Sequence, residues 1–413
     1  MREMKDSGNV WYGKIPYAWE LNKIKYLTTI RSESAIYNPE EDKYIGLENV
    51  NGYSDNVVET DTEYGYSMQS ICKKDDILFS KLRPYLAKVF IAKHNSFCTG
   101  EFIVFSSFNG DRRYLFYSIL NPKFIENINS STYGAKMPRA NPQYIFDQQI
   151  CLPPLDDQQR IAEFLDRECG KIDGLKADIQ AQIDTLEQYK RSVITEAVTH
   201  GLNPSAPMKE CSVSWARQIP QHWKVMPNKH LMTKIKNICP IYKGEDILSL
   251  TMYGVIVRDL DAGGKMPSSF DGYQYIKKGN LLMCLFDIDV TPRCIGIIKQ
   301  NGITSPAYSQ FKMKKIANAR FYYYYYLMLD YTKELLHLAK NLRHSLTEDQ
   351  LGAIKQLVPP LDEQQEIADY LDNKCAEIEQ IIADKKSQIE MLDGYKKSLI
   401  YEYVTGKKEV YYV

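Results

Sequence analysis

Two long stretches of the chain carry apolar residues at alternating spacings of three and four, the pattern of a coiled-coil helix. Each stretch follows the letters PPLD, at 153–156 and at 359–362. A Pro-Pro pair cannot extend a helix backwards, and Asp156 with Gln159, like Asp362 with Gln365, predicts a capped helix start. We expect antiparallel packing of the two helices, because each seam needs a partner. The expected seams are Ile172, Leu175, Ile179, Gln182, Leu186, Tyr189 and Val193, and then Ile378, Ile381, Lys385, Gln388, Leu392, Tyr395 and Leu399.

The segments before these helices have a different pattern. Short β-branched and aromatic runs bounded by Gly, Asn, Asp or Pro predict strands. One aromatic-rich segment in each half, 114–120 and 321–329, predicts a helix. The predicted fold class is therefore α+β, with two mixed α/β globular domains and two long helices. The expected strands are 44–50, 76–82, 88–93 and 102–108, and then 246–252, 254–260, 280–286 and 294–299.

The chain is a tandem repeat. The sequence PPLDDQQRIAEFLD at 153–166 returns as PPLDEQQEIADYLD at 359–372, and 24 of 47 aligned positions from there onward are identical. The motif W-x3-IP-x2-W, which begins at Trp11 and again at Trp215, opens each copy and is interpreted as structural. NPSAP at 203–207 predicts a turn-rich connection. The expected boundaries are a first domain 1–152, a helix 153–200, a linker 201–214, a second domain 215–358, a helix 359–405 and a tail 406–413.

Composition excludes several classes of protein. The 413 residues include 44% apolar residues, enough for packed cores, and no apolar run approaches the ~18–20 residues of a membrane span. The N-terminal residues lack a signal-peptide core, and nine cysteines without an export signal suggest reduced thiols in the cytoplasm. The 52 basic and 52 acidic residues give zero net charge, which by itself argues against a nucleic-acid partner.

Dividing the charge by segment changes that conclusion. Residues 1–152 have a net charge of 0, 153–200 of −4, 201–358 of +9 and 359–413 of −5. The helices are therefore acidic, whereas the second domain is basic and suits a phosphate-rich partner.

Basic side chains also cluster in loops at the ends of predicted strands. Such loops, with Tyr and Asn beside them, suit phosphate contacts and hydrogen bonds to base edges, although a single lysine or arginine is more often an ordinary surface charge. The five tyrosines at 322–326 could stack on bases, but five consecutive residues cannot face one ligand, so packing is expected. The candidate residues for DNA binding are Lys73, Lys74, Lys81, Arg83, Tyr85, Lys88, Lys136, Arg139, Lys277, Lys278, Arg293, Lys340 and Arg343.

Sequence signatures of catalysis and metal binding are scarce. There is no G-x4-GK-[ST] phosphate loop, no strand-bound G-x-G motif, no C-x2-C pair and no G-x-S-x-G elbow. NPQY at 141–144 is similar to the N-P-P-Y tetrapeptide of adenine methyltransferases, but without a glycine-rich cofactor motif it is interpreted as a loop turn. We therefore expect no catalytic residue and no metal site.

Taken together, these features resemble the specificity subunit of type I restriction–modification systems. The resemblance rests on the two PPL-[DE]-x-Q-Q-x-I-A-x-[FY]-L-D helices, the W-x3-IP-x2-W starts, YIGLENV at 44–50 and KKDDILFSKLRPYLAKV at 73–89. The segment KKGNLLMCLFDIDVTPR, which begins at Lys277, departs from that pattern. The resemblance implies two target recognition domains that each read half of a bipartite DNA site, joined by an antiparallel coiled coil that sets the spacer.

It also implies a non-catalytic chain with several partners. These are double-stranded DNA, two methyltransferase subunits and two restriction subunits, with S-adenosylmethionine, ATP and Mg on the partner subunits and no membrane contact. Helix positions expected to bind the methyltransferases are Gln158, Gln159, Ile161, Leu165, Gln364, Gln365, Ile367 and Leu371.

Two alternatives stay open at this stage. One is a self-contained DNA methyltransferase or nuclease with an unrecognised site, which would bind S-adenosylmethionine by itself. The other is a scaffold that bridges proteins without reading DNA, and so would show no sequence preference. The sequence does not give the target bases, the spacer length or the methylated adenines.

Overall fold

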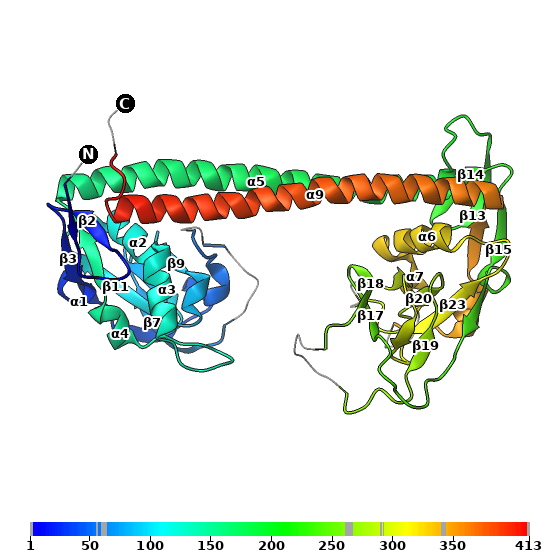
Figure 1. Cartoon of the computed structure of the whole chain (residues 1–413), viewed down its shortest axis with the longest axis horizontal. Helices are drawn as coiled ribbons and strands as arrows, with labels where there is room; N and C mark the ends of the chain where they lie inside the picture. The colour runs from blue at the N-terminus through cyan, green and yellow to red at the C-terminus, as the bar shows by residue number, and fades with distance from the viewer. Residues whose placement is uncertain are drawn as a thin grey trace. The chain divides into compact units, whose positions relative to one another are not determined.

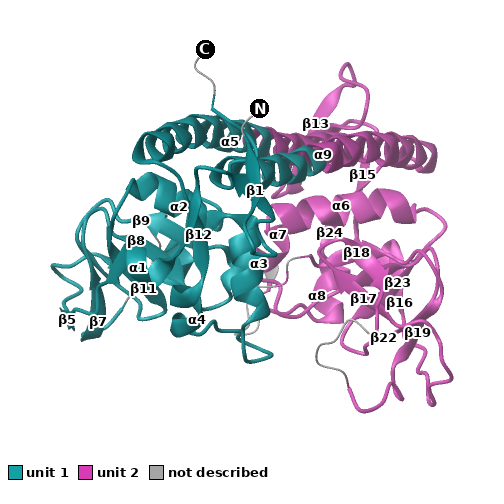
Figure 2. Cartoon of the chain, turned by 60° about the vertical axis from the view of Figure 1, so that its left-hand side comes forward, with its two compact units in different colours: residues 1–180, 386–413 teal, residues 181–385 magenta. Residues whose placement is uncertain are grey.

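The computed structural model describes residues 3–54, 57–58, 64–260, 267–289, 291, 293–339 and 344–410. These residues form two compact units (Figure 2): unit 1 consists of Met1–Gln180 with Lys386–Val413, and unit 2 of Ala181–Lys385. Each unit therefore contains one globular domain, half of the helix that follows it and half of the other long helix.

The domain of unit 1 is built around a four-stranded antiparallel sheet with the order β4-β11-β8-β9. A second sheet has the order β5-β7-β10-β6, and the pairs β1-β2 and β3-β12 lie outside both. The strands are β1 Met4–Asp6, β2 Lys14–Pro16, β3 Glu20–Lys23, β4 Thr28–Ile30, β5 Ser34–Tyr37, β6 Tyr44–Ile45, β7 Ser67–Cys72, β8 Ile77–Ser80, β9 Val89–Ile91, β10 Ser96–Cys98, β11 Phe102–Phe108 and β12 Gln149–Leu152. The short helices are α1 Ile24–Leu27, α2 Arg112–Leu120, α3 Pro122–Ser130 and α4 Pro142–Asp147.

The domain of unit 2 repeats the main sheet of this plan, but its other described strands form pairs in place of a second four-stranded sheet. Its main sheet has the order β16-β23-β20-β21, the counterpart of β4-β11-β8-β9. Two-stranded pairs β13-β14, β15-β24, β17-β18 and β19-β22 complete it. The strands are β13 Met208–Val213, β14 Ala216–Pro220, β15 Lys224–Pro227, β16 Met232–Ile235, β17 Leu248–Thr251, β18 Gly254–Val257, β19 Gln274–Ile276, β20 Leu281–Met283, β21 Ile295–Ile297, β22 Gly302–Thr304, β23 Ser309–Met313 and β24 Lys355–Val358. The short helices are α6 Ala319–Tyr331, α7 Glu334–Leu338 and α8 Glu348–Ala353.

The two long helices are α5, Leu155–His200, and α9, Leu361–Val404 (Figure 1). In unit 1, Asp173 on α5 pairs with Lys396 on α9 at 2.7 Å. Lys176, three residues further along α5, pairs with Asp393, three residues further back on α9. In unit 2, Lys190 on α5 pairs with Glu379 on α9. Within each unit the helices therefore run antiparallel, as the unpartnered seams predicted.

The seam itself differs from the heptad prediction. Leu175 and Tyr189 on α5 are 52% and 48% exposed, whereas Ile172, Ile183 and Ile194 are buried. On α9, Ile381 and Tyr395 are likewise exposed, and Ile382 is buried in place of Ile381. The buried isoleucines of α5 are 11 residues apart, a repeat of 3.67 residues per turn, close to an ordinary α-helix and unlike the 3.5 of a heptad.

Both helix starts also differ from the predicted capping boxes. Each helix begins directly after a Pro-Pro pair, so Asp156 and Asp362 lie inside the first turn and are not N-cap residues. Carboxylates there still favour the helix, since its N-terminal end carries a partial positive charge.

Two further expectations are corrected by the structure. YIGLENV at 44–50 is mostly not a strand, since Tyr44–Ile45 is a two-residue strand, Leu47–Asn49 forms a 3₁₀ turn and Val50 makes an isolated bridge to Val57. The predicted linker 201–214 contains β13, which pairs with β14 in a hairpin. By contrast, both aromatic-rich segments form the predicted helices, as α2 and α6.

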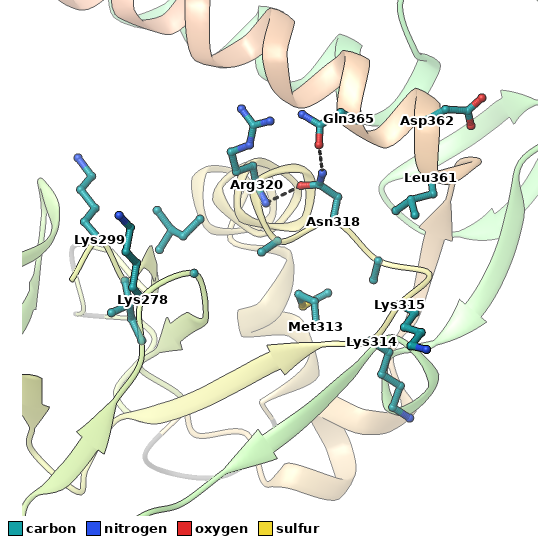
Figure 3. Close-up of a pocket in the computed structure, with 15 residues that line it drawn as sticks. Lys278, Lys299, Met313, Lys314, Lys315, Asn318, Arg320, Leu361, Asp362 and Gln365 are labelled. Carbon is teal, nitrogen blue, oxygen red and sulfur yellow. Dashed lines mark hydrogen bonds between the residues drawn. The ribbon is translucent and has the colours of Figure 1, made fainter. Parts of the chain in front are cut away.

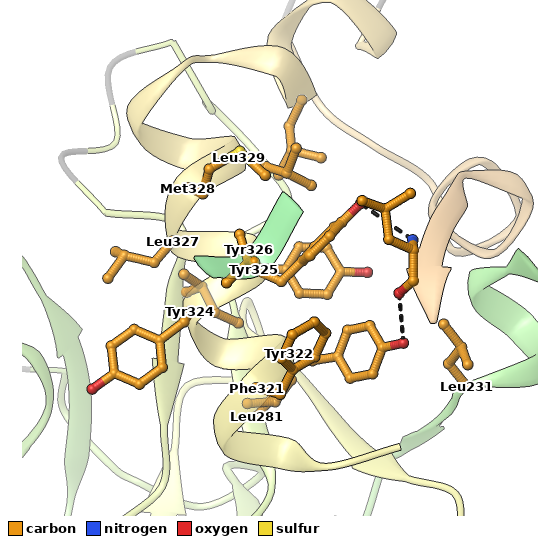
Figure 4. Close-up of a cluster of buried hydrophobic side chains, with 14 of the residues drawn as sticks. Leu231, Leu281, Phe321, Tyr322, Tyr324, Tyr325, Tyr326, Leu327, Met328 and Leu329 are labelled. Atoms are coloured by element: carbon orange, nitrogen blue, oxygen red, sulfur yellow. Dashed lines mark hydrogen bonds between the residues drawn. The ribbon is translucent and has the colours of Figure 1, made fainter. Parts of the chain in front are cut away.

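The tyrosine run at 322–326 lies on α6 and packs into the core of unit 2 (Figure 4). Tyr322, Tyr325 and Tyr326 are fully buried. The hydroxyl of Tyr322 donates to the carbonyl of Leu357 at 3.0 Å, and that of Tyr325 accepts from the Leu357 amide at 3.3 Å. These hydrogen bonds attach α6 to β24. The prediction that the tyrosines pack in the core and do not stack on bases is confirmed.

The Trp motifs are structural as well. Trp19 and Trp223, the second tryptophan of each motif, are 1% and 0% exposed. The indole N–H of Trp223 donates to Glu363 at 3.0 Å, so the start of this domain is fixed to the start of α9.

All nine cysteines are free thiols, and all except the half-buried Cys211 are buried. Burial raises the pKa of Cys151 to about 12 and the pKa of Cys169 and Cys375 to about 11. In the described part of the chain, no helix combines the length and the apolar character needed to cross a membrane.

We predict that Cys211 is the thiol that reacts first with a thiol-disulfide reagent in the folded protein at pH 8, because the other eight thiols are buried and shielded from the reagent. Cys211→Ser should remove the fast phase in a stopped-flow titration, and denaturant should release the other eight cysteines. Several fast thiols in the Cys211→Ser protein would contradict this burial pattern.

Candidate DNA interface and partner-binding helices

The first turn of each long helix is joined to its own domain by a buried glutamine. The side-chain oxygen of Gln158 accepts from the backbone N–H of Asp111 at 2.9 Å, and its amide nitrogen donates to the carbonyl of Pro153 at 2.8 Å. Gly110 permits this approach, since a Cβ there would lie 2.4 Å from the Gln158 oxygen. Unit 2 repeats the arrangement through Gln364, which accepts from the amide of Asn318 at 2.8 Å and donates to the carbonyl of Pro359 at 2.9 Å.

Two turns further along each helix, an aspartate binds an arginine and a tyrosine of the domain. Asp166 accepts from Arg113 of α2 and from the Tyr117 hydroxyl at 2.7 Å. In unit 2, Asp372 accepts from Arg320 of α6 and from the Tyr324 hydroxyl at 2.8 Å. Burial is the main reason that the pKa of Tyr117 and of Tyr324 is raised, so both hydroxyls keep their protons. The repeated Gln and Asp of the PPLD helices thus fix each domain to its helix.

This arrangement corrects most of the predicted partner contacts. Six of the eight residues are buried inside their own unit, so they do not form an exposed docking surface: Gln158, Ile161, Leu165, Gln364, Ile367 and Leu371. Gln365 is half-buried and binds Asn318 and Asp369, and Gln159 is the exposed member of the set. A helix face that packs on its own domain and one that binds a partner show the same spacing of apolar residues. The sequence could therefore not distinguish the two.

Other residues of the helices are exposed and apolar. Leu155, Leu175 and Tyr189 on α5 are each about half exposed, at 52%, 52% and 48%. The residues 206 positions later show the same exposure, at 48%, 45% and 58%, and these are Leu361, Ile381 and Tyr395. Unit 1 therefore carries Leu155, Leu175 and Tyr395, and unit 2 carries the equivalent set. These side chains are spread along the helices and do not form one contiguous patch, so what distinguishes them is their recurrence at equivalent positions of the repeat.

The predicted basic residues of unit 1 are largely engaged within the chain. Lys73 pairs with Glu33 at 3.2 Å, and the Glu33 pKa is lowered chiefly by this contact. Lys81 donates to the carbonyl of Gly100 at 2.6 Å. Lys88 is half-buried and donates to the carbonyl of Leu47 at 2.6 Å, so its role is to hold the loop. Lys74, Arg83 and Tyr85 are exposed.

The loop at 133–142 lies beside the end of β8. Arg139 pairs with Glu101 at 2.6 Å, and its backbone bridges to Tyr133 and Leu82. Lys136 is exposed at the loop tip. The structure thus brings Lys81, Arg83 and Arg139 together, since the Arg83 amide also donates to the carbonyl of Pro138 at 2.7 Å.

In unit 2 the predicted residues have different roles. Lys277 and Lys278 are exposed in the turn before β20. Arg293 instead donates to the carbonyl of Met252 at 2.9 Å and to the Tyr323 hydroxyl, so it is a structural residue. Lys340 and Arg343 lie outside the described residues.

The prediction missed a basic cleft in unit 2, with a volume of about 1140 Å³. Lys299, Lys314 and Lys315 line it together with Lys278 and the first residues of α6 (Figure 3). Lys299 follows β21 and the KK pair follows β23. The signal available in the sequence was that Lys299 ends the predicted strand 294–299 and that all three lysines lie in the segment with a charge of +9; no predicted strand directly precedes the Lys314–Lys315 pair.

The described residues contain no group of three or more His, Cys, Asp or Glu side chains suited to a metal ion. NPQY at 141–144 begins α4, with the Asn141 side chain accepting from the Gln143 amide and Pro142 in the first turn. Its asparagine is therefore a helix cap.

Comparison with known proteins decides the family. Residues 19–185 and 294–391 match the family described as type I restriction modification DNA specificity domain. The chain belongs to this family. The resemblance to this family is thereby confirmed, and both PPLD helix starts lie within the matched residues.

Individual relatives agree with this membership. The MjaVIII specificity subunit of a type I restriction enzyme from Methanocaldococcus jannaschii is 25% identical over 318 residues, which are 73% of this chain and 71% of the relative. The putative MjaX specificity subunit of the same organism is 24% identical over 437 residues, covering 96% and 95%. A solved structure that describes complex assembly and conformational transition of the type I R-M system shares the fold, with a TM-score of 0.69, 13% identity and coverage of 95% and 99%.

We predict that Gln158→Leu destabilises unit 1 by about 2–4 kcal/mol, because it leaves the Asp111 amide and the Pro153 carbonyl without a partner in a buried place. Gln159→Leu, at the exposed neighbouring position, should change stability by less than about 0.5 kcal/mol. Urea unfolding followed by circular dichroism measures both. Equal losses for the two variants would show that the buried bridge contributes nothing.

Proposed function

We propose that this chain is the DNA-reading, non-catalytic subunit of a type I restriction–modification complex, and that each unit reads one half of a bipartite target. The observation that carries this proposal is the duplicated unit in a chain of the DNA specificity family. Two sheet domains of the same strand order, each held by the same Gln and Asp contacts to its helix, suit two half-sites read by equivalent surfaces.

The repeat supports two copies of one partner. Leu155, Leu175 and Tyr395 in unit 1 and their equivalents in unit 2 are two similar exposed apolar sets on acidic helices. We propose that each set binds one methyltransferase subunit, in place of the buried residues first expected. The presence of two restriction subunits, and of S-adenosylmethionine, ATP and Mg on the partner subunits, stays a prediction. So does a cytoplasmic location, which the nine free thiols favour.

We predict that cells carrying this chain and its methyltransferase contain N6-methyladenine in one bipartite motif with a spacer of fixed length. Single-molecule sequencing of their DNA measures this. Cells with the methyltransferase alone are the control and should lack the motif. Methylation that is independent of this chain, or a scaffold-like absence of sequence preference, would overturn the proposed function.

We predict that the helix pair sets the spacer. α5 has 46 residues, about 69 Å at ~1.5 Å per residue. Deleting 177–180 from α5 together with 389–392 from α9 removes residues that face each other in the pairing register. This deletion shortens the pair by roughly 6 Å, close to two base pairs at ~3.4 Å each.

The expected result is a methylated motif whose spacer is shorter by about two base pairs and whose half-sites are unchanged. Replacing the same eight residues by alanine without deletion is the matched control and should keep the original spacer. A deletion variant that folds, methylates and retains the original spacer would contradict the ruler role.

A further inference from the structure

The turns that precede β8 in unit 1 and β20 in unit 2 have the same backbone geometry. In unit 1, the amide of Asp75 donates to the carbonyl of Ala92 at 2.8 Å, and the amide of Lys74 donates to the side chain of Asn95 at 2.9 Å. Unit 2 repeats both bonds. The amide of Gly279 donates to the carbonyl of Ile298 at 2.8 Å, and the amide of Lys278 donates to the side chain of Asn301 at 2.9 Å. The two turns can therefore be compared residue by residue.

The turn of unit 1 lies within a network of paired charges. Asp76 is buried and pairs with Arg31 at 2.7 Å, and Glu33 pairs with Lys73 at 3.2 Å. Arg112, at the start of α2, reaches across and donates to the carbonyl of Asp75 at 2.7 Å. Arg31, Lys73 and Arg112 are thus engaged by carboxylates or a carbonyl of the chain, and Arg112 spans the gap between the turn and the helix.

Unit 2 has lost this network but kept the lysines. The equivalents of Asp75, Asp76 and Glu33 are uncharged, and the arginine that spans the gap is absent. Gly279 replaces Asp75, Asn280 replaces Asp76 and Asn237 replaces Glu33. Ile235 stands at the place of Arg31, and Ala319 at the place of Arg112. Lys277, Lys278 and Lys299 correspond to Lys73, Lys74 and Lys93.

The result is the open cleft of about 1140 Å³ between this turn and the start of α6. Lys278 and Lys299 lie on one side of it, and Lys314 and Lys315 lie on the other (Figure 3). Among the described residues, the ammonium groups of Lys278, Lys299 and Lys315 have no ion-pair partner. The amide of Lys314 donates to the carbonyl of Leu231, as the amide of Asn109 donates to the carbonyl of Leu27, so unit 1 has an uncharged asparagine where unit 2 has Lys314.

The remaining charges in the cleft do not offset these lysines. Arg320 is paired with Asp369 and Asp372, so it adds no free charge. Asp362 is the carboxylate that lines the cleft in its described part, against four lysines. Lysines act as point charges without the geometry for bidentate pairing, which suits phosphate groups held in several orientations more than one fixed ligand.

We propose that this cleft binds backbone phosphates of duplex DNA, and that unit 2 supplies most of the salt-dependent affinity while unit 1 supplies little. The inference rests on the proposed function, since it assigns the phosphate contacts of a DNA-reading chain to one of its two units. An open, lysine-lined surface fits a continuous polyanion, because it can follow the strand without enclosing it.

The test uses the full chain and a labelled duplex of about 30 base pairs of random sequence, with the affinity measured by fluorescence anisotropy over a series of salt concentrations. The unit 2 variant is Lys277→Gln, Lys278→Gln and Lys299→Gln. The matched unit 1 variant is Lys73→Gln, Lys74→Gln and Lys93→Gln. All six side chains are exposed, so both proteins should fold, which circular dichroism checks.

The logarithm of affinity falls by about 0.9 per phosphate contact for each tenfold increase in salt. In the unit 2 variant, the slope of log affinity against log salt concentration should therefore become shallower by about 2–3. In the unit 1 variant it should become shallower by less than about 1. A reciprocal variant that transfers the whole unit 1 network should lower the slope in the same way. It combines Ile235→Arg, Asn237→Glu, Gly279→Asp, Asn280→Asp and Ala319→Arg, so that the buried carboxylate at 280 receives its arginine partner. Asp75 adopts a φ of 69° in unit 1, so aspartate is tolerated at the Gly279 position, where φ is 88°.

The outcomes separate this inference from the proposed function. A wild-type chain that does not bind duplex DNA would contradict the proposed function itself. If the wild-type chain binds DNA, two results would overturn only the assignment to unit 2. One is an equal decrease of the salt slope in both variants, and the other is an unchanged slope in the unit 2 variant. Binding of inorganic pyrophosphate that the unit 2 variant loses, with an unchanged DNA slope, would identify a small-anion site and also overturn it.

Discussion

The organisation of each unit depends on the attachment of a sheet domain to the first turns of a long helix. A buried glutamine side chain, Gln158 or Gln364, satisfies a backbone amide of the domain and a backbone carbonyl before the helix at the same time. Buried polar groups without partners cost free energy, so the glutamine can be replaced only at a cost to both elements. Asp166 and Asp372 add a second point of attachment through an arginine and a tyrosine. With two points fixed, the orientation of each domain on its half of the helix pair is set.

This attachment explains why the repeated sequence is concentrated in the helices. The helix residues must fit both a domain and the other helix, and the positions that meet neither stay exposed. Ile161 and Leu165 serve the domain, Asp173 and Lys176 serve the other helix, and Leu155 and Leu175 stay exposed. Within the domains, by contrast, the loops between equivalent strands are free to differ as long as the backbone bonds of the turns are kept. The lysine turns show this, with identical bonds and different charges.

Zero net charge is therefore the sum of unlike parts. Unit 1 pairs Arg31, Lys73 and Arg139 with nearby carboxylates, whereas the cleft of unit 2 holds several lysines without ion-pair partners among the described residues. The acidic helices then cancel the excess in the total. Since phosphate contacts depend on unpaired cations and not on the count of basic residues, the two domains differ electrostatically far more than their shared fold suggests.

The sequence by itself determined the repeat, the two long helices, most strands of the central sheets and the family, because these depend on patterns that recur within short windows. Periodicity, Pro-Pro boundaries and the PPLD motif are local. It did not determine which face of a helix is covered: Gln158 and Ile161 were interpreted as a docking surface, and the structure buries them in their own unit. Nor could it separate Lys88 and Arg293, which hold loops, from Lys278 and Lys299, which line an open cleft. Only the tertiary structure decided these points, because the partner of a charge or of an apolar face is a residue distant in sequence.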